Sequence, residues 1–522
     1  MDRLAATCER VASDSSRLKK VALLAGYFRT LGDEDLARAV RFLCCRERVS
    51  AGHATLRAAA MAATGWDLET LRICHREVGD TGETIALLLA GCPGDLPLPL
   101  AEAETIYAAL SAARTAAAKT ELLRQVFTRR RPQAVKYFVK IITGNLRIGL
   151  QEKMVEEAVA QASGVSHEAV RQANNRAGDL PRVALACRRG GLHAVEARLF
   201  HPMDFMLAKP LDSLMDFAEP GQWWAEDKYD GIRSQVHCEN GRVRIYTRGF
   251  EDATASFPEV VLAMRKLGGA AVIDGEILGW KDGRPLPFNV LQQRIARKKL
   301  TPGVMEEVPA ALMAYDLMYR GTLVLDLPIE ERRRLLDELP VMRSPLHSPS
   351  SIEEVERLFS EARERGNEGL VLKRRGSLYE AGRRSGAWLK LKRPYATLDV
   401  VITAAEQGHG RRAAVLSDYT FGVRSGEGYV NVGKAYSGLT GEEIRELTRR
   451  LRAAASDRFG RVFLVRPEIV LEVAFDGVRK SPRHKSGFAL RFPRIVRWRR
   501  DKKPAECDTI ERVEELYEAS LR

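Results

Sequence analysis

The stretch Glu226-Asp227-Lys228-Tyr229-Asp230-Gly231-Ile232-Arg233 places a lysine between carboxylates, directly before an Asp-Gly pair. Most charged runs of this kind are solvated turns, and the stretch alone favours that interpretation. A functional site becomes the better interpretation because further polar motifs follow downstream, beside apolar segments that alternate like β-strands.

These further motifs follow in a fixed order along the chain. None is specific by itself, and the last, for example, is ordinarily explained as a half-exposed strand. The order carries the information, because each motif is weak and the whole series is specific. The motifs are Tyr246-Thr-Arg248-Gly-Phe, Asp274-Gly-Glu276, Tyr315-Asp316, Asn367-Glu368-Gly-Leu-Val-Leu-Lys373, and Arg384 leading into Trp388-Leu-Lys390-Leu-Lys392.

This order, K-x-D-G-x-R, D-G-E, Y-D, E-G and W-x-K-x-K, resembles that of the covalent nucleotidyltransferases. That superfamily comprises ATP-dependent DNA ligases, RNA ligases and mRNA-capping enzymes. Residues 481–502 look like the C-terminal motif of the DNA ligases. Thr143-Gly-Asn-Leu-Arg147-Ile-Gly149 is similar to the DNA-binding domain of archaeal and eukaryotic replicative-type DNA ligases. The resemblance covers nearly the whole chain and implies an ATP-dependent DNA ligase.

The texture of the sequence divides the chain into three domains. Residues 1–195 are Ala-rich with helical periodicity, and residues 196–394 carry short alternating runs with two helical stretches between them. Residues 395–522 carry five or so short strands with one helix among them and a helical end. We therefore predict a multidomain protein: an all-α N-terminal domain, an α+β nucleotidyltransferase domain (ATP-grasp-like, antiparallel) and a C-terminal OB-fold β-barrel.

Individual elements follow from the same patterns. Hairpin turns are expected at Glu239-Asn-Gly-Arg and Lys281-Asp-Gly-Arg, because Asn-Gly and Asp-Gly adopt the backbone that tight hairpins need. Helices are expected at about residues 18–28, 33–43, 101–118, 121–126, 153–162, 257–267, 352–365, 441–455 and 509–521.

The resemblance implies that Lys228 is the catalytic nucleophile. Its amine would attack the α-phosphorus of ATP and hold AMP as a phosphoramidate. A free lysine with a pKa of ~10.4 is almost entirely protonated at pH 7. Neighbouring cations and a bound magnesium ion would therefore have to lower the pKa of this amine.

The resemblance also assigns the residues around the nucleotide. Tyr315 would stack on adenine, Glu276 would hold the ribose hydroxyl, and Lys390 would contact the α-phosphate. Glu276 and Glu368 would position Mg²⁺, which prefers carboxylate oxygens and water. Asp230 would orient the Lys228 loop or a metal-bound water. The nucleotide-binding set is Glu226, Lys228, Arg233, Arg248, Glu276, Tyr315, Arg384, Lys390 and Lys392.

Two groups of basic residues lie outside this set. In the C-terminal motif, the resemblance implies that the residues close over ATP and orient the pyrophosphate, although a basic face for the DNA backbone explains them too. In the helical domain, Arg129-Arg-Arg131, Lys136 and Arg147 are phosphate contacts or an ordinary solvated surface. The C-terminal set is Arg491, Arg494, Arg499, Asp501 and Lys502.

Composition supports a polyanionic partner. Lys and Arg number 83 against 69 Asp and Glu, which gives a net charge of +14. No apolar run approaches 18 residues and the first ten residues have no apolar signal core, so neither a membrane span nor secretion is expected.

The eight cysteines form no C-x-x-C pair, which argues against a zinc ribbon. Residues 428–435 nearly match a phosphate loop, but Ala435 has no hydroxyl group for magnesium and the stretch is strand-like. Residues 408–413 resemble a dinucleotide fingerprint, but no βαβ pattern surrounds them.

The resemblance to the DNA ligases implies an enzyme that uses ATP and Mg²⁺ to seal nicks in double-stranded DNA through lysyl-AMP and 5′-adenylylated DNA. We expect a monomer in a prokaryotic cytoplasm, associated with the nucleoid, with a sliding clamp as a candidate partner. Replication, repair and recombination remain open as its role. The alternatives are an RNA ligase or capping enzyme, which the long helical domain and the Phe492-Pro-Arg motif disfavour, and a DNA-clamping protein with an inactive catalytic domain.

Overall fold

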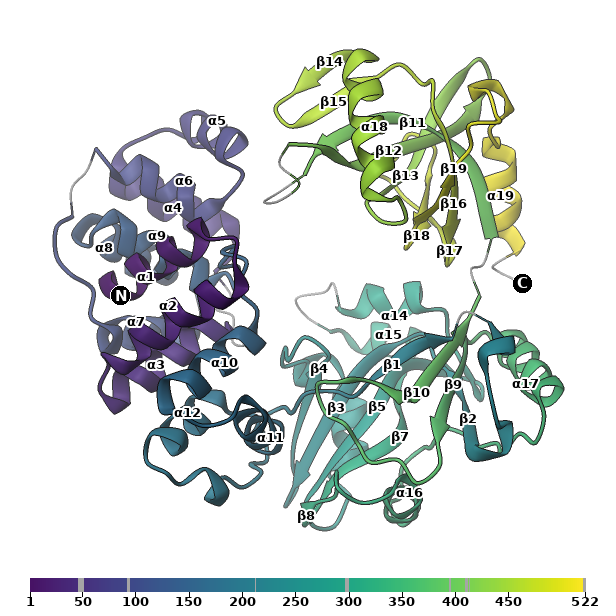
Figure 1. Cartoon of the computed structure of the whole chain (residues 1–522), viewed down its shortest axis with the longest axis horizontal. Coiled ribbons are helices and arrows are strands. Elements are labelled where there is room, and N and C mark those ends of the chain that lie inside the picture. Colours follow the sequence, from purple (N-terminus) through teal and green to yellow (C-terminus); the bar gives the residue numbers. More distant parts are fainter. Residues whose placement is uncertain are drawn as a thin grey trace. The chain divides into compact units, whose positions relative to one another are not determined.

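The computed structural model describes residues 1–45, 51–91, 94–211, 213–295, 300–393, 396–408, 412 and 414–519. The chain separates into two compact units, Met1–Leu391 and Lys392–Arg522 (Figure 1). The fold class predicted from the sequence is confirmed: a helical region precedes an α+β region, and a β-rich unit follows. The predicted boundary between residues 394 and 395 lies outside the described residues.

The helical region packs around one apolar core that includes Leu4, Phe28, Phe127 and Phe138. Several of its helices begin at side-chain caps such as Ser16 and Asp67, which accept hydrogen bonds from backbone N–H groups in the first turn. The helices are α1 Asp2–Ser13, α2 Arg17–Arg29, α3 Asp33–Cys44, α4 His53–Thr64, α5 Leu68–Val78, α6 Thr81–Leu89, α7 Leu100–Ala112, α8 Ala116–Arg129, α9 Pro132–Ile142, α10 Glu152–Ser163, α11 His167–Ala177 and α12 Leu180–Arg188.

The single helix expected over residues 101–118 is wrong. The chain leaves the helix at Ala113, which is extended, and starts a new one after Thr115, whose hydroxyl accepts from the backbone N–H of Ala118. A threonine at this position competes for the backbone and so favours a new N-terminus over a continuous helix.

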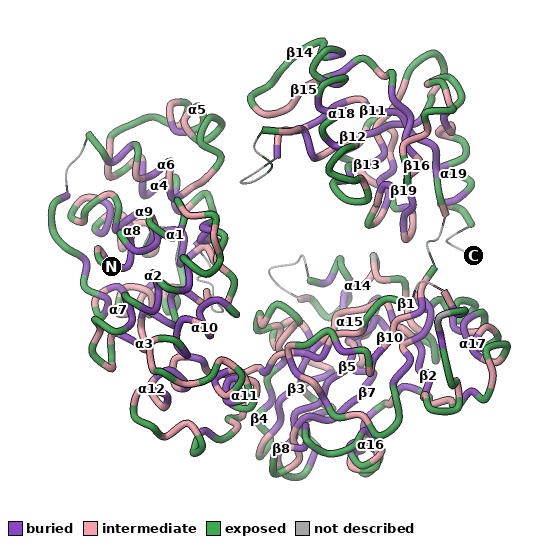
Figure 2. Tube along the Cα trace, viewed as in Figure 1, coloured by how far each residue is buried: buried purple, intermediate pink, exposed green. Residues whose placement is uncertain are grey.

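The α+β region contains two sheets, and buried side chains on their strands form much of its core (Figure 2). The order in one sheet is β1-β10-β9-β2, with β1 parallel to β10; in the other it is β4-β3-β5-β7-β8, with β6 on β5. Both predicted hairpins are present, because β3 pairs with β4 and β5 with β6. The strands are β1 Leu207–Leu211, β2 Trp223–Lys228, β3 Ile232–Glu239, β4 Arg242–Thr247, β5 Ala271–Lys281, β6 Arg284–Pro285, β7 Ala310–Arg320, β8 Thr322–Leu323, β9 Gly369–Arg374 and β10 Arg384–Lys392.

Five helices accompany these sheets in the described part of the region, where two were expected. Helices α13 and α16 pack on β7, and α17 packs on β2 and β9. The three missed helices are six to nine residues long, too short for a clear 3.6-residue period. The helices are α13 Pro258–Met264, α14 Phe288–Ile295, α15 Pro302–Glu307, α16 Ile329–Asp337 and α17 Ile352–Glu364.

The second unit is built on β11, which pairs with β12, β15 and β16. Residues 428–435 form strand β13 on β12, so the phosphate-loop resemblance there is rejected as expected. The fingerprint-like residues 408–413 lie largely outside the described residues. The elements are β11 Ala396–Gln407, β12 Leu416–Ser425, β13 Gly428–Ala435, α18 Gly441–Ala453, β14 Ala455–Phe459, β15 Val462–Val465, β16 Val470–Phe475, β17 Gly477–Lys480, β18 Phe488–Arg491, β19 Arg494–Trp498 and α19 Ile510–Ala519.

Two expectations from composition can be compared with the described residues. None of the described helices is long and apolar enough to cross a membrane. The seven cysteines in the described ranges carry free thiols.

A buried ion pair joins β7 to α16. The guanidinium of Arg332 contacts both carboxylate oxygens of Asp316, at 2.8 and 2.9 Å, and neither side chain is more than 2% exposed. Arg332 also donates to the backbone oxygens of Leu327 and Ser377. One guanidinium therefore fixes three segments of the α+β region.

We predict that Arg332→Met lowers the free energy of unfolding by about 3–5 kcal/mol, because it leaves the Asp316 carboxylate buried without a cation. Arg334→Met, on the same helix but 61% exposed, should cost less than about 1 kcal/mol. Urea unfolding followed by tryptophan fluorescence measures both. Equal losses in the two variants would contradict the buried-pair argument.

Candidate active site

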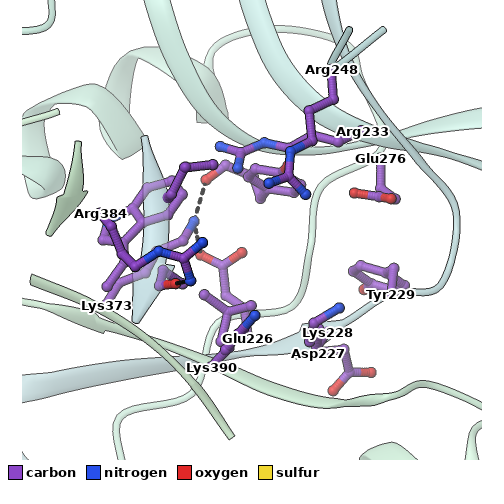
Figure 3. A pocket seen from close by; sticks show the side chains of 15 residues that line it. Glu226, Asp227, Lys228, Tyr229, Arg233, Arg248, Glu276, Lys373, Arg384 and Lys390 are labelled. Carbon is purple, nitrogen blue, oxygen red and sulfur yellow. Dashed lines mark hydrogen bonds and ion pairs between the residues drawn. The ribbon is translucent and has the colours of Figure 1, made fainter. Parts of the chain in front are cut away.

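A cavity of about 210 Å³ lies among strands of both sheets of the α+β region (Figure 3). Side chains from β1, β2, β3, β5, β7, β9 and β10 reach it, so residues almost two hundred positions apart meet there. Its lining is Leu207, Ala208, Glu226, Asp227, Lys228, Tyr229, Arg233, Arg248, Glu276, Tyr315, Val371, Lys373, Arg384, Trp388 and Lys390.

Lys228 is the last residue of β2 and extends its amine into this cavity. The amine forms an ion pair with Glu368, at 2.6 Å between Nζ and Oε2. The backbone N–H of Glu368 also donates to the carbonyl oxygen of Lys228, at 2.8 Å. The pairing of β2 with β9, which sets Lys228 opposite Gly369, places these groups together. The two residues are thus joined through both their side chains and their backbones.

Glu276 faces the same space from β5, opposite Arg233 in the register of β3 and β5. Burial raises the pKa of its carboxyl group to about 8, because desolvation outweighs the opposite effect of Lys228 and Arg233. A bound cation beside Glu276 would favour the ionised carboxylate.

Arg233 is held by a buried network. Its Nη2 and Nε contact the Asp274 carboxylate at 2.8 and 3.2 Å, and the Tyr379 hydroxyl donates to that carboxylate at 2.7 Å. The guanidinium also lies 4.8 Å from the Phe205 ring centroid and 5.7 Å from that of Tyr315. Asp274 is fully buried, so this pair fixes the direction in which Arg233 points.

Lys373 ends the motif that begins at Asn367, but the sequence analysis gave it no role in the site. Its Nζ lies 2.8 Å from Glu226 Oε1 and donates to the carbonyl oxygen of Tyr315 at 2.7 Å (Figure 3). Lys373 is 1% exposed, and its amine is 4.6 Å from the Trp388 ring centroid. The available signal was a lysine at the end of the apolar run Gly369-Leu-Val-Leu, where a partner is required for burial.

The structure brings together most of the predicted nucleotide-binding residues, since all of them except Lys392 line the cavity. Lys392 forms an ion pair with Asp476 in the second unit. Of the predicted metal ligands, Glu276 lines the cavity and Glu368 contacts Lys228. Among the described residues, no three carboxylate, His or Cys side chains are grouped closely enough to hold a metal ion alone. A magnesium ion would therefore take further ligands from phosphates and water, as it usually does.

The predicted residues of the C-terminal motif gather around two carboxylates of the second unit. Arg494 contacts Asp476 at 3.2 Å, beside Lys392. Arg499 and Lys502 contact Asp399 at 2.9 and 2.6 Å, and Arg499 also pairs with Asp501. The guanidinium of Arg491 lies 5.1 Å from the ring centroid of Phe492. Much of this basic motif is thus matched by acids of its own unit.

The helical region shows the same pattern. Lys136 is 12% exposed and lies between Glu9 and Glu83, each at 2.6 Å, so it is not part of a solvated surface. Arg131 contacts Asp2 at 3.5 Å but is 55% exposed. Arg147 donates to the carbonyl oxygen of Gly79 and is 49% exposed. Of these predicted phosphate contacts, Arg129, Arg131 and Arg147 are exposed.

The raised pKa of Glu276 makes stability depend on pH. The unfolded carboxyl group titrates near 4.5 and the folded one near 8, so the folded state binds the extra proton between these values. The stabilisation is therefore present below about pH 4.5 and is lost as the pH rises to 8.

We predict that Glu276→Gln removes this loss. The stability of the variant relative to the unaltered protein should rise between pH 5.5 and 8.5, at no more than ~1.4 kcal/mol per pH unit. Urea unfolding at both pH values, without nucleotide or metal, measures it. Glu364→Gln, an exposed carboxylate at the end of α17, should follow the unaltered protein. A pH dependence equal in all three proteins would show that the folded state does not raise the pKa of Glu276.

Comparison with known proteins matches this site to one family. The family described as "ATP dependent DNA ligase domain" matches residues 205–392, "DNA ligase N terminus" matches residues 1–160, and "ATP dependent DNA ligase C terminal region" matches residues 412–502. A "Probable DNA ligase" of Koribacter versatilis is 41% identical, over 100% of this chain and 97% of that protein. "DNA ligase 1" of Korarchaeum cryptofilum is 36% identical, over 100% and 99%.

The fold has a counterpart among solved structures. The structure titled "Pmar-Lig_Pre." covers 95% of this chain and 99% of its own, with a TM-score of 0.60 and 15% identity, which is a likeness of fold alone. The relatives cover the chain and the three matched segments follow in the same order as the helical, α+β and β-rich parts. The chain belongs to the ATP-dependent DNA ligases, enzymes that use ATP, with Mg²⁺ as the usual cofactor, to seal nicks in DNA.

Proposed function

We propose that Lys228 is the residue that carries AMP when this ligase seals a nick in duplex DNA. The observation that supports it is the Lys228 amine in a cavity that also holds Glu276, Arg248, Arg384 and Lys390. The amine must lose its proton before it can attack phosphorus, and the Glu368 carboxylate at 2.6 Å is placed to accept or hold that proton. The nitrogen then bonds to the α-phosphorus of ATP, the bond to the bridging oxygen breaks, and pyrophosphate leaves.

The other cavity residues bind and orient the nucleotide. Tyr315 offers its ring face to adenine, and Glu226 reads the base edge with its carboxylate fixed by Lys373. Glu276 holds the ribose hydroxyl. The cations neutralise phosphate oxygens, where a guanidinium can make two parallel contacts. They are Arg233, Arg248, Arg384, Lys390 and, from the start of the second unit, Lys392.

Glu276 and Glu368 fit a magnesium ion. They are hard oxygen donors beside Lys228, and the Glu276 carboxyl group, with its pKa of about 8, needs a cation to ionise fully at neutral pH. When bound, the ion supplies positive charge to the phosphates and weakens the hold of Glu368 on the amine proton.

AMP then passes from Lys228 to the 5′-phosphate of the nick, and the 3′-hydroxyl attacks that phosphate and releases AMP. These steps depend on positioned positive charge more than on a protein base. In the first step, Arg491, Arg494, Asp501 and Lys502 of the C-terminal motif orient the leaving pyrophosphate. Their carboxylate partners keep the basic side chains in fixed directions until phosphate is present.

We also propose the division of labour expected from the sequence. Residues 1–195 bind DNA, residues 196–394 form the adenylylation domain, and residues 395–522 form the OB-fold domain. The enzyme works as a monomer in the cytoplasm of a prokaryote, associated with the nucleoid, in replication, repair or recombination. A sliding clamp is a candidate partner.

The first prediction from this proposal concerns the nucleophile. Lys228→Ala should abolish protein adenylylation, and Lys228→Arg should do the same, because a guanidinium stays protonated. Incubation with α-labelled ATP and magnesium, followed by detection of protein-bound label, measures it. Both variants should keep at least part of their activity on a pre-adenylylated nick, since that step bypasses the nucleophile. Acid-labile AMP persisting on Lys228→Ala would disprove the assignment.

The second prediction concerns the C-terminal motif. Arg494→Ala should slow adenylylation by roughly 10- to 100-fold, the worth of one or two charge-assisted hydrogen bonds, and should affect sealing of a pre-adenylylated nick much less. Arg497→Ala is a matched control on the same strand, since Arg497 is 62% exposed and pairs with Glu472. Equal losses in both assays would favour a contact between Arg494 and the DNA backbone instead.

A further inference from the structure

We propose that Asp227 is a positioning residue for adenylylation: it holds the segment 365–368 so that Glu368 stays against the Lys228 amine. The inference rests on the proposed role of Lys228 and adds a residue that the motif series does not assign. Asp227 lies in the chain between Glu226, which pairs with Lys373, and Lys228, which pairs with Glu368.

Asp227 lines the cavity, but its carboxylate is engaged by the turn that leads from α17 into β9. In Figure 3 the carboxylate lies on the far side of Lys228 from Glu226. It contacts the guanidinium of Arg365 through two parallel hydrogen bonds, of 3.0 Å from Nε and 2.8 Å from Nη2. The amide nitrogen of Asn367 donates to the same carboxylate at 2.8 Å. The Asp227 side chain is 5% exposed, so three donors compensate a desolvated charge.

These donors belong to the short turn that leads from α17 into β9. Arg365 is the C-cap of α17, and the backbone N–H of Asn367 donates to the carbonyl oxygen of Ala362. Glu368 follows directly and donates its own N–H to the carbonyl oxygen of Lys228 at 2.8 Å. Asp227 therefore holds two residues of the turn, Arg365 and Asn367, that come just before Glu368.

The turn has little freedom to settle elsewhere while β9 stays in register. Gly369 has a φ of +146°, and a Cβ there would lie 2.3 Å from the carbonyl oxygen of Leu391 and 2.7 Å from the Phe359 ring. Asn367 is 4% exposed, and its amide oxygen has no hydrogen-bond partner among the described residues. The amide nitrogen is the half of this buried group that has a partner, so its contact with Asp227 fixes how the Asn367 side chain is oriented.

A direct chemical role for Asp227 fits these contacts less well. Both carboxylate oxygens are engaged by Arg365, and one of them also by Asn367. The group is therefore poorly placed to take a proton from Lys228 or to bind a metal ion. Asp227 can instead fix the distance between Lys228 and Glu368. It directly precedes Lys228 in the chain, and its partners Arg365 and Asn367 come just before Glu368.

The test uses the full chain and single-turnover adenylylation with α-labelled ATP and magnesium. Asp227→Asn and Arg365→Met should each lower the rate at saturating ATP by roughly 10- to 100-fold. The ATP concentration that gives half the maximal rate should change by less than about twofold, because the Asp227 carboxylate and the Arg365 guanidinium are engaged with each other. The double variant should be no slower than the slower single variant, since one clamp is lost in each case. Arg365→Lys, which keeps the charge but not the fork, should recover part of the rate.

Two further measurements keep the outcome decisive. Arg357→Met, on the exposed face of α17, should adenylylate like the unaltered protein. Arg365 is 44% exposed, so Arg365→Met keeps the inference testable even if Asp227→Asn folds poorly, and thermal unfolding of each variant is followed in parallel. Sealing of a pre-adenylylated nick, in which Lys228 forms no bond, should fall less than adenylylation.

The results separate the two proposals. Normal rates in Asp227→Asn and Arg365→Met, with Lys228→Ala inactive, would overturn the positioning role and leave the nucleophile in place. A rise in the half-saturating ATP concentration in step with the loss of rate would also overturn it, in favour of a nucleotide contact. Protein-bound AMP on Lys228→Ala would instead refute the proposed function itself.

Discussion

The pairing of β2 with β9 is the constraint on which the active site depends. It sets Lys228 opposite Gly369 and so brings the amine to Glu368, the residue before that glycine. The same two strands bring Glu226 to Lys373, with both side chains almost wholly buried. Burying a charge without a partner costs several kcal/mol, so these ion pairs hold only if the strand register is kept. Strand pairing and charge compensation therefore support each other.

The acidic residues around the cavity are of two kinds: some are fully paired with an arginine, and one is not. Asp274 and Asp316 are buried, and each is matched by two contacts from one arginine. Glu276 is different, since burial raises the pKa of its carboxyl group and the neighbouring Lys228 and Arg233 offset this only in part. The cavity therefore has a rigid frame and one carboxyl group whose ionised form a bound cation would favour. This arrangement fits a triphosphate substrate that arrives with a divalent cation.

The second unit follows the same rule with other residues. Asp476 joins Lys392 to Arg494, and Asp399 joins Arg499 to Lys502, so the C-terminal motif is a set of ion pairs rather than an open basic patch. For a basic side chain that must contact phosphate, a carboxylate partner limits rotamer freedom before the ligand binds. The net charge of +14 describes the whole chain, whereas Lys136 shows that a single basic residue can be neutralised inside a domain.

The sequence by itself determined the fold class, both hairpin turns and the membership of most of the cavity. These features depend on local signals: apolar periodicity, Asn-Gly and Asp-Gly turns, and short motifs that occur in a characteristic order. Only the tertiary structure decided which charges meet. Lys373 and Glu226 are 147 residues apart, and Asp227 lies 138 residues from Arg365. The short helices α14, α15 and α16 were missed because they are too short to show a clear period, and α14 and α16 also depend on packing against β5 and β7. A local pattern indicates the path of the backbone, but the partner of a buried charge is set by strand register and by the space left between packed elements, which only the folded chain defines.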